Sequence, residues 1–202
     1  MKTTKIKVCG MMESKDIEAV NKYQPDFIGF IIDYPKSHRS KTQEEVKILA
    51  KNVDPEIQKV GVFVDAPVEE VIALAKEGTI DLVQLHGTED DAYITKVQQE
   101  TGKPVIKAYV IQSPKDIQSA KDSMADLVLL DCGRGRGKTF PWQWIPEDFG
   151  RPFFLAGGLQ PDNLQNAYEA VHPWGMDISS GVETDGKKDE AKIAEVMNWR
   201  AE

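Results

Sequence analysis

The chain has 202 residues, 41% hydrophobic and 29% charged, a composition typical of one ordinary globular domain with a substantial core. Its formal net charge of −8 at pH 7 argues against nucleic acid and an anionic membrane surface as main partners. With two cysteines, Cys9 and Cys132, and with no apolar signal segment or membrane-spanning run, the sequence predicts a cytoplasmic protein.

Short apolar runs recur along the whole chain. Most are rich in Val, Ile and Phe and lack strict alternation, which is typical of parallel strands that are buried on both faces. Eight such runs predict eight strands, in chain order Ile6–Val8, Phe27–Ile32, Lys59–Val64, Leu82–Leu85, Val105–Val110, Leu127–Leu130, Phe153–Ala156 and Met176–Ile178.

Amphipathic stretches of helical length follow most of these runs. They predict helices at Ser14–Tyr23, Thr42–Asn52, Val68–Lys76, Asp90–Thr101, Pro114–Asp122, Asn163–Ala170 and Lys188–Trp199. Ser14 is the expected cap of the first helix, and Thr42 begins a capping-box pattern with Glu45. Gly78 and Gly102 stand where helices should stop.

Residues 132–152 break this alternation, because they are rich in Gly, Arg, Pro and Trp. We expect at most a short, irregular helix there, around Trp144–Phe149. Long loops inside compact domains are usually functional, so the stretch from Gly133 to Lys138 is interpreted as a mobile cover with a cationic tip. Whether Arg134, Arg136 or Lys138 contacts a ligand is left open.

Eight strand–helix units in a chain of this length favour a closed (β/α)8 TIM barrel over an open, doubly wound sheet, which shares the alternation. No linker or repeat interrupts the chain, so we predict a single domain over residues 1–202. A parallel barrel brings the C-terminal ends of its strands to one rim, where the active sites of such enzymes lie. The polar residues that follow the apolar runs should therefore share one pocket.

Two turns that are rich in Gly and Ser follow the last two predicted strands, Gly157-Gly158 and Ser179-Ser180-Gly181. In barrels, the loops at these places commonly bind phosphate through backbone N–H groups, which attract an anion whatever the net charge. Glycine permits close backbone approach, and serine adds hydroxyl donors. One Gly-Gly pair could simply form a tight turn, but two such turns at these strand ends predict a phosphate site.

Cys9 and Asp131 end the first and sixth runs, on opposite sides of a closed barrel. A free thiol has a pKa of about 8.5, so it becomes a competent base or nucleophile where the site favours the anion. A carboxyl group becomes an acid where desolvation raises its pKa. Taken alone, the two residues would be interpreted as a small buried hydrophobe and a loop cap. A substrate phosphate anchored by the last two loops would hold its sugar between the thiol and the carboxyl.

Short motifs in fixed order run from Lys5 to about Ile193. They are Lys-Val-Cys-Gly, Gly-Phe-Ile-Ile-Asp-Tyr-Pro-Lys-Ser-His-Arg, Val-Gly-Val-Phe-Val, Val-Gln-Leu-His-Gly, Leu-Leu-Asp, Gly-Lys-Thr-Phe, Leu-Ala-Gly-Gly-Leu and Asp-Ile-Ser-Ser-Gly-Val-Glu. This ordered set resembles phosphoribosylanthranilate isomerase of tryptophan biosynthesis. The resemblance implies a (β/α)8 barrel and an aldose–ketose isomerase. The implied reaction is the Amadori rearrangement of N-(5-phosphoribosyl)anthranilate to 1-(2-carboxyphenylamino)-1-deoxyribulose 5-phosphate.

The resemblance also assigns roles to residues. It implies that Cys9 is the general base, that Asp131 is the general acid and that Arg39 binds the anthranilate carboxylate. It puts the phosphate on Gly157-Gly158 and Ser179-Ser180-Gly181. A guanidinium suits a carboxylate because it offers two parallel N–H donors, which Lys cannot reproduce. No cofactor is implied, because the imine of the substrate itself acts as the electron sink.

Three further residues lie at predicted strand ends. Gln84 and His86 flank the end of the fourth strand, and we expect them to position the substrate or to shape the mouth of the pocket rather than to act directly. Asp177 is expected to contact the ribose or the base, or else to cap the strand end. The histidines are dispersed without ligand spacing, which argues against zinc. Two details depart from the family pattern: the arginines at 134 and 136, and Pro141 where an aspartate is common.

Two other functions compete with this interpretation. The related isomerase of the histidine pathway performs the same rearrangement, but it resembles a barrel with two catalytic aspartates and two phosphate sites. Cys9 and the single predicted phosphate site disfavour it. A barrel that binds sugar phosphates without catalysis is the alternative from another class, and a turnover assay separates the two. The expected partner is a small-molecule substrate, with no nucleic acid and no membrane, and both a monomer and a homodimer stay open.

Overall fold

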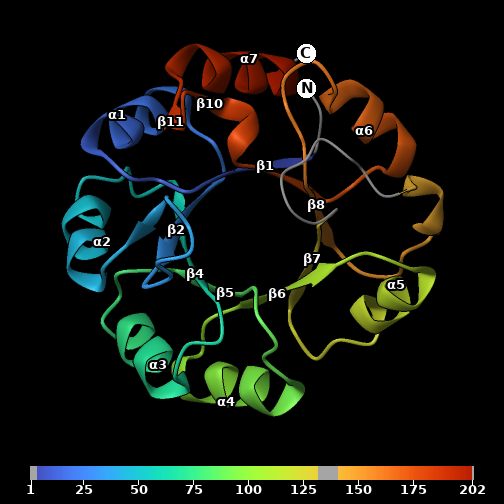
Figure 1. Cartoon of the computed structure of the whole chain (residues 1–202), viewed down its shortest axis with the longest axis horizontal. Helices are drawn as coiled ribbons and strands as arrows, with labels where there is room; N and C mark the ends of the chain where they lie inside the picture. Colours follow the sequence, from blue (N-terminus) through green and yellow to red (C-terminus); the bar gives the residue numbers. More distant parts are fainter. Residues whose placement is uncertain (1–3, 132–140, 202) are drawn as a thin grey trace.

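The chain forms a closed barrel of parallel strands surrounded by helices (Figure 1). The computed structural model describes residues 4–131 and 141–201. Within these ranges the barrel strands are β1 (Lys5–Cys9), β2 (Phe27–Ile32), β4 (Gln58–Phe63), β5 (Leu82–Leu85), β6 (Val105–Val110), β7 (Leu127–Asp131), β8 (Phe153–Ala156) and β9 (Gly175–Ile178). Because β1 pairs in parallel with both β2 and β9, the sheet closes on itself.

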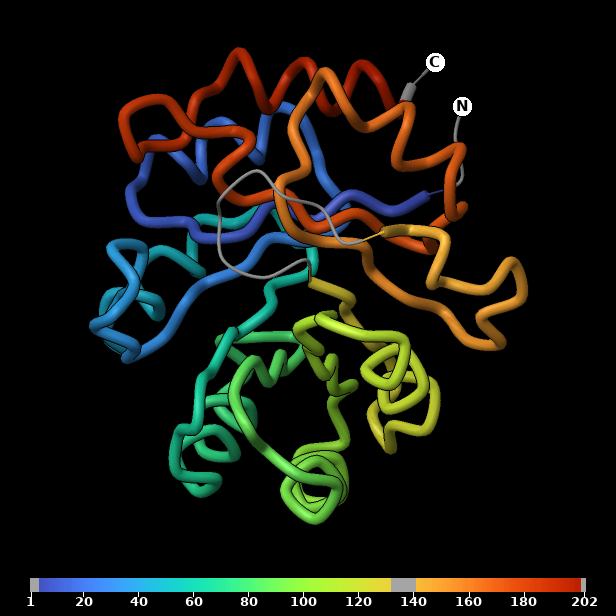
Figure 2. Tube along the Cα trace, turned by 45° about the vertical axis from the view of Figure 1, so that its right-hand side comes forward, coloured from blue at the N-terminus to red at the C-terminus, as the bar shows by residue number. Residues whose placement is uncertain are grey.

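The helices of the described residues lie outside this ring. They are α1 (Ser14–Tyr23), α2 (Gln43–Ala50), α3 (Val68–Lys76), α4 (Asp91–Thr101), α5 (Pro114–Lys121), α6 (Leu164–Val171) and α7 (Glu190–Ala201), with short 3-10 turns η1 (Trp142–Trp144) and η2 (Ser180–Val182). They follow the chain order around the ring, so that α7 lies beside α1 (Figure 2). None of the helices described is long and apolar enough to cross a membrane.

The predicted fold class, a (β/α)8 barrel, is confirmed by this architecture. All eight predicted strands are present, and those at Phe27–Ile32, Leu82–Leu85, Val105–Val110 and Phe153–Ala156 have the predicted bounds. Successive side chains of each strand point to opposite faces of the sheet, and both faces are covered. This explains why the apolar runs lack strict alternation of apolar and polar residues.

Several local predictions were wrong. The first helix is preceded by Glu13 in an extended conformation, and the buried Asp16 carboxylate accepts from the Glu13 N–H at 3.1 Å, so Ser14 is not the cap. The helix expected at Trp144–Phe149 is replaced by η1. Ile145 is extended, the conformation that a following proline favours, and Pro146 therefore ends the turn.

Three very short strands were not predicted from the sequence. Strand β3 (Ser40–Lys41) pairs in parallel with the end of β2, and β10 (Glu183–Thr184) pairs antiparallel with β11 (Lys187–Lys188). Because β11 takes up Lys188, the last helix begins at Glu190, two residues after its predicted start. Other boundary signals are confirmed, including the capping box of Thr42 and Glu45 and the left-handed Gly102 after α4.

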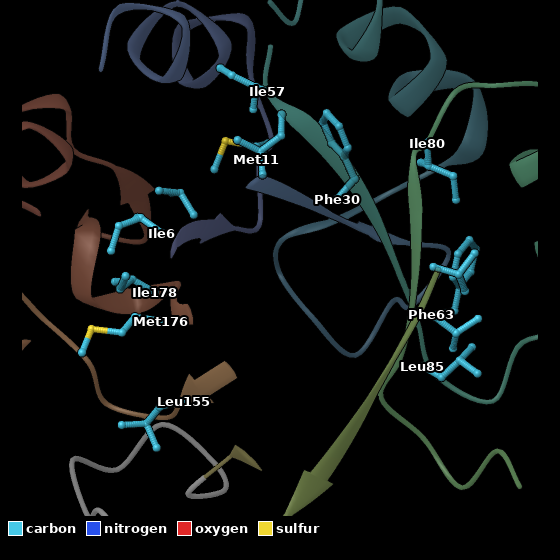
Figure 3. Packing of buried hydrophobic residues seen from close by; sticks show 14 of the residues in the cluster. Ile6, Met11, Phe30, Ile57, Phe63, Ile80, Leu85, Leu155, Met176 and Ile178 are labelled. Carbon is cyan, nitrogen blue, oxygen red and sulfur yellow. The ribbon is translucent and has the colours of Figure 1, made fainter. Parts of the chain in front are cut away.

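The hydrophobic core has two parts. The larger part lies between the strands and the helices, where Ile6, Met176 and Ile178 of β1 and β9 lie together (Figure 3). The smaller part fills the barrel itself. At its N-terminal end, the rings of Phe27, Phe154 and Trp174 lie within 5.9 Å of one another between centroids. This aromatic cluster occupies the end of the barrel opposite the rim that carries the strand C-termini.

Candidate active site

A cavity of about 340 Å³ opens at the C-terminal rim of the barrel. Its walls come from the ends of seven strands and from the loops after them. The lining residues are Cys9, Ile31, Arg39, Val62, Gln84, His86, Asp131, Ala156, Gly157, Gly158, Leu159, Asp177, Ser179 and Ser180. Every residue that the sequence analysis selected for a site lies here, apart from Gly181, which packs behind the wall.

Cys9 ends β1 with its side chain toward the barrel interior, and 6% of the residue is exposed. Burial raises the pKa of the Cys9 thiol above its ordinary value, although the ammonium groups of Lys7 and Lys188 act in the opposite direction. A general base needs the anionic form, so burial alone works against that role. The backbone of Cys9 is fixed by Ser179, whose hydroxyl donates to the Cys9 carbonyl at 3.0 Å.

Lys7 is a fully buried lysine inside the barrel, and the sequence analysis did not select it. Its Nζ lies 2.9 Å from Oδ1 of Asp177, across the pairing of β1 with β9. Burial opposes the charge of Lys7, but the Asp177 carboxylate and the Cys9 sulfur outweigh it and raise the pKa of Lys7. One signal could have found it, because residues two apart in a strand share a face, and Lys7 is two residues before Cys9.

Asp131 ends β7 and has a histidine beside it. Nε2 of His86 lies 3.3 Å from Oδ2 of Asp131, and these side chains are 27% and 20% exposed. On its other side, the His86 ring has Nδ1 at 3.4 Å from Nε2 of Gln84. Gln84 is buried, and its Oε1 has no hydrogen-bond partner among the described residues. The three side chains thus form a row along the wall of the cavity.

Arg39 is held at the rim by structure that the sequence analysis missed. It immediately precedes β3, which pairs with the end of β2, and its side chain passes over Gly10. Gly10 has a φ of 87°, and a Cβ there would come within 2.5 Å of Arg39 Cδ. The Nε and Nη2 groups of Arg39 donate to the two carboxylate oxygens of Glu183 at 2.6 and 2.7 Å.

Glu183 belongs to the β10–β11 hairpin and faces Lys188 across it. Lys188 donates to Oε1 of Glu183 at 2.6 Å and to the Ser179 carbonyl at 3.0 Å. Burial disfavours the carboxylate, but Arg39 and Lys188 outweigh this effect and lower the pKa of Glu183 from 4.5 to about 2. Glu183 therefore stays ionised and binds both cations to the turn after β9.

The two Gly/Ser turns lie against each other at the ends of β8 and β9. Gly157 and Gly158 have φ values of 88° and 69°, which strongly favour glycine. At Gly181 a Cβ would overlap the carbonyl oxygen of Leu159, so only glycine permits this contact between the turns. The Asn163 amide closes the first turn by donating to the Gly158 carbonyl at 2.9 Å.

Residues 132–140 lie outside the described residues. They include Cys132 and the cations Arg134, Arg136 and Lys138 of the predicted cover. Within the described ranges, no group of three or more His, Cys, Asp or Glu side chains is arranged to hold a metal ion. The ionisable groups that line the described cavity are the Cys9 thiol, the carboxyls of Asp131 and Asp177, the His86 imidazole and the Arg39 guanidinium.

Barrels that carry such turns after the last two strands, with polar side chains at other strand ends, belong to the TIM-barrel enzymes that bind phosphorylated small molecules. The chain is a member of this class. Residues 6–199 match the family model of N-(5'-phosphoribosyl)anthranilate (PRA) isomerase. The chain therefore belongs to the phosphoribosylanthranilate isomerase family.

Individual relatives agree with this assignment. The chain is 41% identical over 197 residues to N-(5'-phosphoribosyl)anthranilate isomerase of Clostridium acetobutylicum, covering 94% of each chain. The crystal structure of the isomerase from Thermotoga maritima has a TM-score of 0.89 at 32% identity, with 98% of each chain covered. Another isomerase structure, with a TM-score of 0.87 at 31% identity and the same coverage, is a complex with reduced 1-(o-carboxyphenylamino)-1-deoxyribulose 5-phosphate.

Proposed function

We propose that this chain isomerises N-(5'-phosphoribosyl)anthranilate to 1-(2-carboxyphenylamino)-1-deoxyribulose 5-phosphate, a step of tryptophan biosynthesis. Membership of the family supports this activity. The structural observation that carries it is the common cavity of Cys9, Asp131 and Arg39 with the two turns of β8 and β9. A phosphate held at the turns lets the sugar reach both the thiol and the carboxyl.

The reaction needs two proton transfers. Asp131, in its protonated form, donates to the ribose ring oxygen as the C1′–O bond breaks, and the nitrogen lone pair forms the imine. Cys9, as the thiolate, then takes the proton from C2′, and the C–H electron pair moves into the imine to give an enolamine. The enolamine tautomerises to the ketone. The substrate supplies its own electron sink, so the proposal includes no metal and no organic cofactor.

His86 and Gln84 hold the acid in position under this proposal. If the Gln84 amide donates to Nδ1 of His86, the ring proton lies on Nε2 and points at Oδ2 of Asp131. A hydrogen bond of this kind fixes the rotation of the carboxyl group toward the ring oxygen. Oε1 of Gln84 is the buried acceptor available for a ribose hydroxyl. Asp177 faces the same cavity and is proposed to contact the substrate there.

Arg39 is proposed to bind the anthranilate carboxylate, and Glu183 defines how it can do so. Glu183 already occupies Nε and Nη2 of the guanidinium. The carboxylate of the substrate must therefore bind at the end of the guanidinium, to Nη1 and the second N–H of Nη2, or displace Glu183. Charge-assisted hydrogen bonds of this type are about twice as strong as neutral ones, which favours an anionic aromatic amine over an uncharged one.

A turnover assay tests the proposal. The substrate is formed in situ from anthranilate and phosphoribosyl pyrophosphate by a phosphoribosyltransferase, and the loss of anthranilate-type fluorescence is followed after the purified chain is added. We expect turnover without added metal. If the chain binds the substrate and never turns it over, it is a sugar-phosphate-binding barrel instead. We further propose that the protein works in the cytoplasm as a monomer or homodimer, which sedimentation would distinguish.

A further inference from the structure

Lys7 is a buried cation for which the reaction steps above have no use. The interior of the barrel around it is otherwise mostly apolar, with Phe27, Val60 and Phe154 in the same cluster as Cys9. Removing an ammonium group from water is costly unless it is paired and hydrogen-bonded. An apolar side chain would fill the same space without that cost. The presence of a lysine here therefore requires a reason beyond packing.

The geometry brings this cation to the thiol. Lys7 is fixed by Asp177 at 2.9 Å, and the charge of its ammonium favours the anionic form of the Cys9 sulfur. Gly29 of the neighbouring strand makes room for both groups. A Cβ at Gly29 would come within 2.6 Å of Sγ of Cys9 and 3.2 Å of Nζ of Lys7. Sulfur and nitrogen thus share the space that a missing side chain leaves.

The charges around the thiol are incomplete without a further anion. Five charged groups face the Cys9 thiol or pair with a group that faces it. They are the cations Lys7, Arg39 and Lys188 and the carboxylates Asp177 and Glu183. Three cations and two carboxylates leave one positive charge in excess. A thiolate at Cys9 supplies the third negative charge and makes the buried cluster neutral. Asp131 and His86 lie at other strand ends of the same cavity.

We propose that Lys7 is a positioning residue for the isomerisation, whose buried ammonium, held by Asp177, stabilises the thiolate of Cys9 while the base waits for the C2′ proton. The inference rests on the proposed role of Cys9 as the base. Lys7 stays protonated throughout, and the proton from C2′ goes to sulfur. Asp177 acts against the thiolate but less strongly than Lys7 does. Asp177 therefore orients the ammonium without cancelling its effect.

The test measures the thiol directly and needs no substrate. Cys132→Ser removes the second cysteine, and the alkylation rate of Cys9 by iodoacetamide is then measured across pH, since only the thiolate reacts. We expect Lys7→Met to slow alkylation at about pH 8 by roughly tenfold or more, the effect of a pKa raised by about one unit. The difference in alkylation rate between Lys7→Met and the parent protein should shrink toward about pH 10.5, whereas a purely steric change slows the reaction equally at every pH.

Three further variants control for misfolding and for nonspecific effects. Lys7→Met leaves Asp177 buried without its partner, so Lys7→Met/Asp177→Asn, which keeps the interior neutral, should fold and still alkylate more slowly. Asp177→Asn alone should alkylate faster, because an opposing charge is gone. Lys107→Met is the matched control. Lys107 is a second buried lysine with a carboxylate partner, Glu89 at 2.8 Å, and its loss should leave the Cys9 rate within about twofold.

The outcomes separate the inference from the proposed function. An unchanged alkylation rate in the double variant, or a loss that is the same at every pH, overturns the role of Lys7 even if the enzyme turns over normally. An inactive wild-type chain whose Cys9 still responds to Lys7 overturns the proposed function instead. As a second readout, kcat of the double variant should fall below that of Asp177→Asn by a factor similar to the ratio of their alkylation rates.

Discussion

At the scale of single residues, the two proposed proton-transfer groups occupy different environments. Cys9 lies deep in the wall, where burial raises its pKa. Asp131 is more exposed and has His86 at 3.3 Å. A base that removes a proton from carbon benefits from dry surroundings, because its anion is more reactive when it is less solvated.

Removing either group should abolish turnover with little loss of binding. We expect Cys9→Ala and Asp131→Asn each to lower kcat by about 10²–10⁴-fold, the contribution of a positioned acid or base, with KM changed by only a few-fold. Steady-state kinetics measures this, and circular dichroism shows that each variant is folded. Turnover close to that of the wild type in either variant would remove that residue from the mechanism.

Glu183 gives the fold a dependence on acid. Its pKa is about 2 in the folded chain and 4.5 ordinarily, because Arg39 and Lys188 outweigh the effect of burial. A carboxyl whose pKa is lowered by folding stabilises the fold at pH values above its ordinary pKa. This stabilisation is lost as the pH falls from about 4.5 to about 2. We expect wild type and Glu183→Gln to differ in unfolding free energy near pH 7 and to converge toward pH 2, as urea titrations would measure. A constant difference would contradict this.

At the scale of elements, the two turns after β8 and β9 depend on one another. Gly181 lies so close to Leu159 that a Cβ would overlap its carbonyl oxygen, so the close approach of the two turns requires a glycine there. This contact explains why Gly181 does not line the cavity although it belongs to the predicted phosphate motif. Gly181 instead sets the distance between the two turns that would hold the anion.

We therefore expect Gly181→Ala to raise KM by about tenfold or more and to weaken inhibition by inorganic phosphate in parallel, since the second turn must shift. Gly150→Ala is the control. Gly150 has a positive φ of 81°, which Gly181 does not share, but nothing lies within 4 Å of a Cβ there. Gly150→Ala carries backbone strain and Gly181→Ala carries a steric overlap, and only Gly181→Ala should lose phosphate affinity. An equal loss of phosphate affinity in both variants would show that general destabilisation causes the effect.

The sequence predicted the strands and helices well because each has its own periodicity. It failed at β3, β10 and β11, which are two residues long and exist only through pairing with a neighbour. The same limit applied to the site. Cys9 and Asp131 were found because they end apolar runs, whereas Glu183 is defined by its partners Arg39 and Lys188, which are distant or non-adjacent in sequence. Partners across strands cannot be derived from one sequence.

At the scale of the whole molecule, the barrel separates stability from chemistry. The aromatic cluster of Phe27, Phe154 and Trp174 fills one end, and the cavity opens at the other. Phe154 is completely buried. In this class of fold the end with the strand N-termini serves stability, and the opposite rim carries the reacting groups. Substitutions in the aromatic cluster should thus change the stability of the fold and not substrate recognition.

Phe154→Ala tests this separation. We expect it to lower the free energy of unfolding by about 3–5 kcal/mol, through lost burial and the cavity left behind, while KM stays within about twofold at a temperature where the variant is folded. Urea unfolding gives the first quantity, and kinetics gives the second. A large change in KM with little change in stability would show that the two ends are coupled.

The ion pair of Lys7 and Asp177 joins the first strand of the barrel to the last, which lie 170 residues apart in the chain. During translation, Lys7 is synthesised early and Asp177 is synthesised 170 residues later. A nascent chain that lacks its final strand would hold an unmatched ammonium beside its thiol, and the ring could not shut. Activity should therefore appear all at once, late in translation, which makes the catalytic rate itself a reporter of barrel closure.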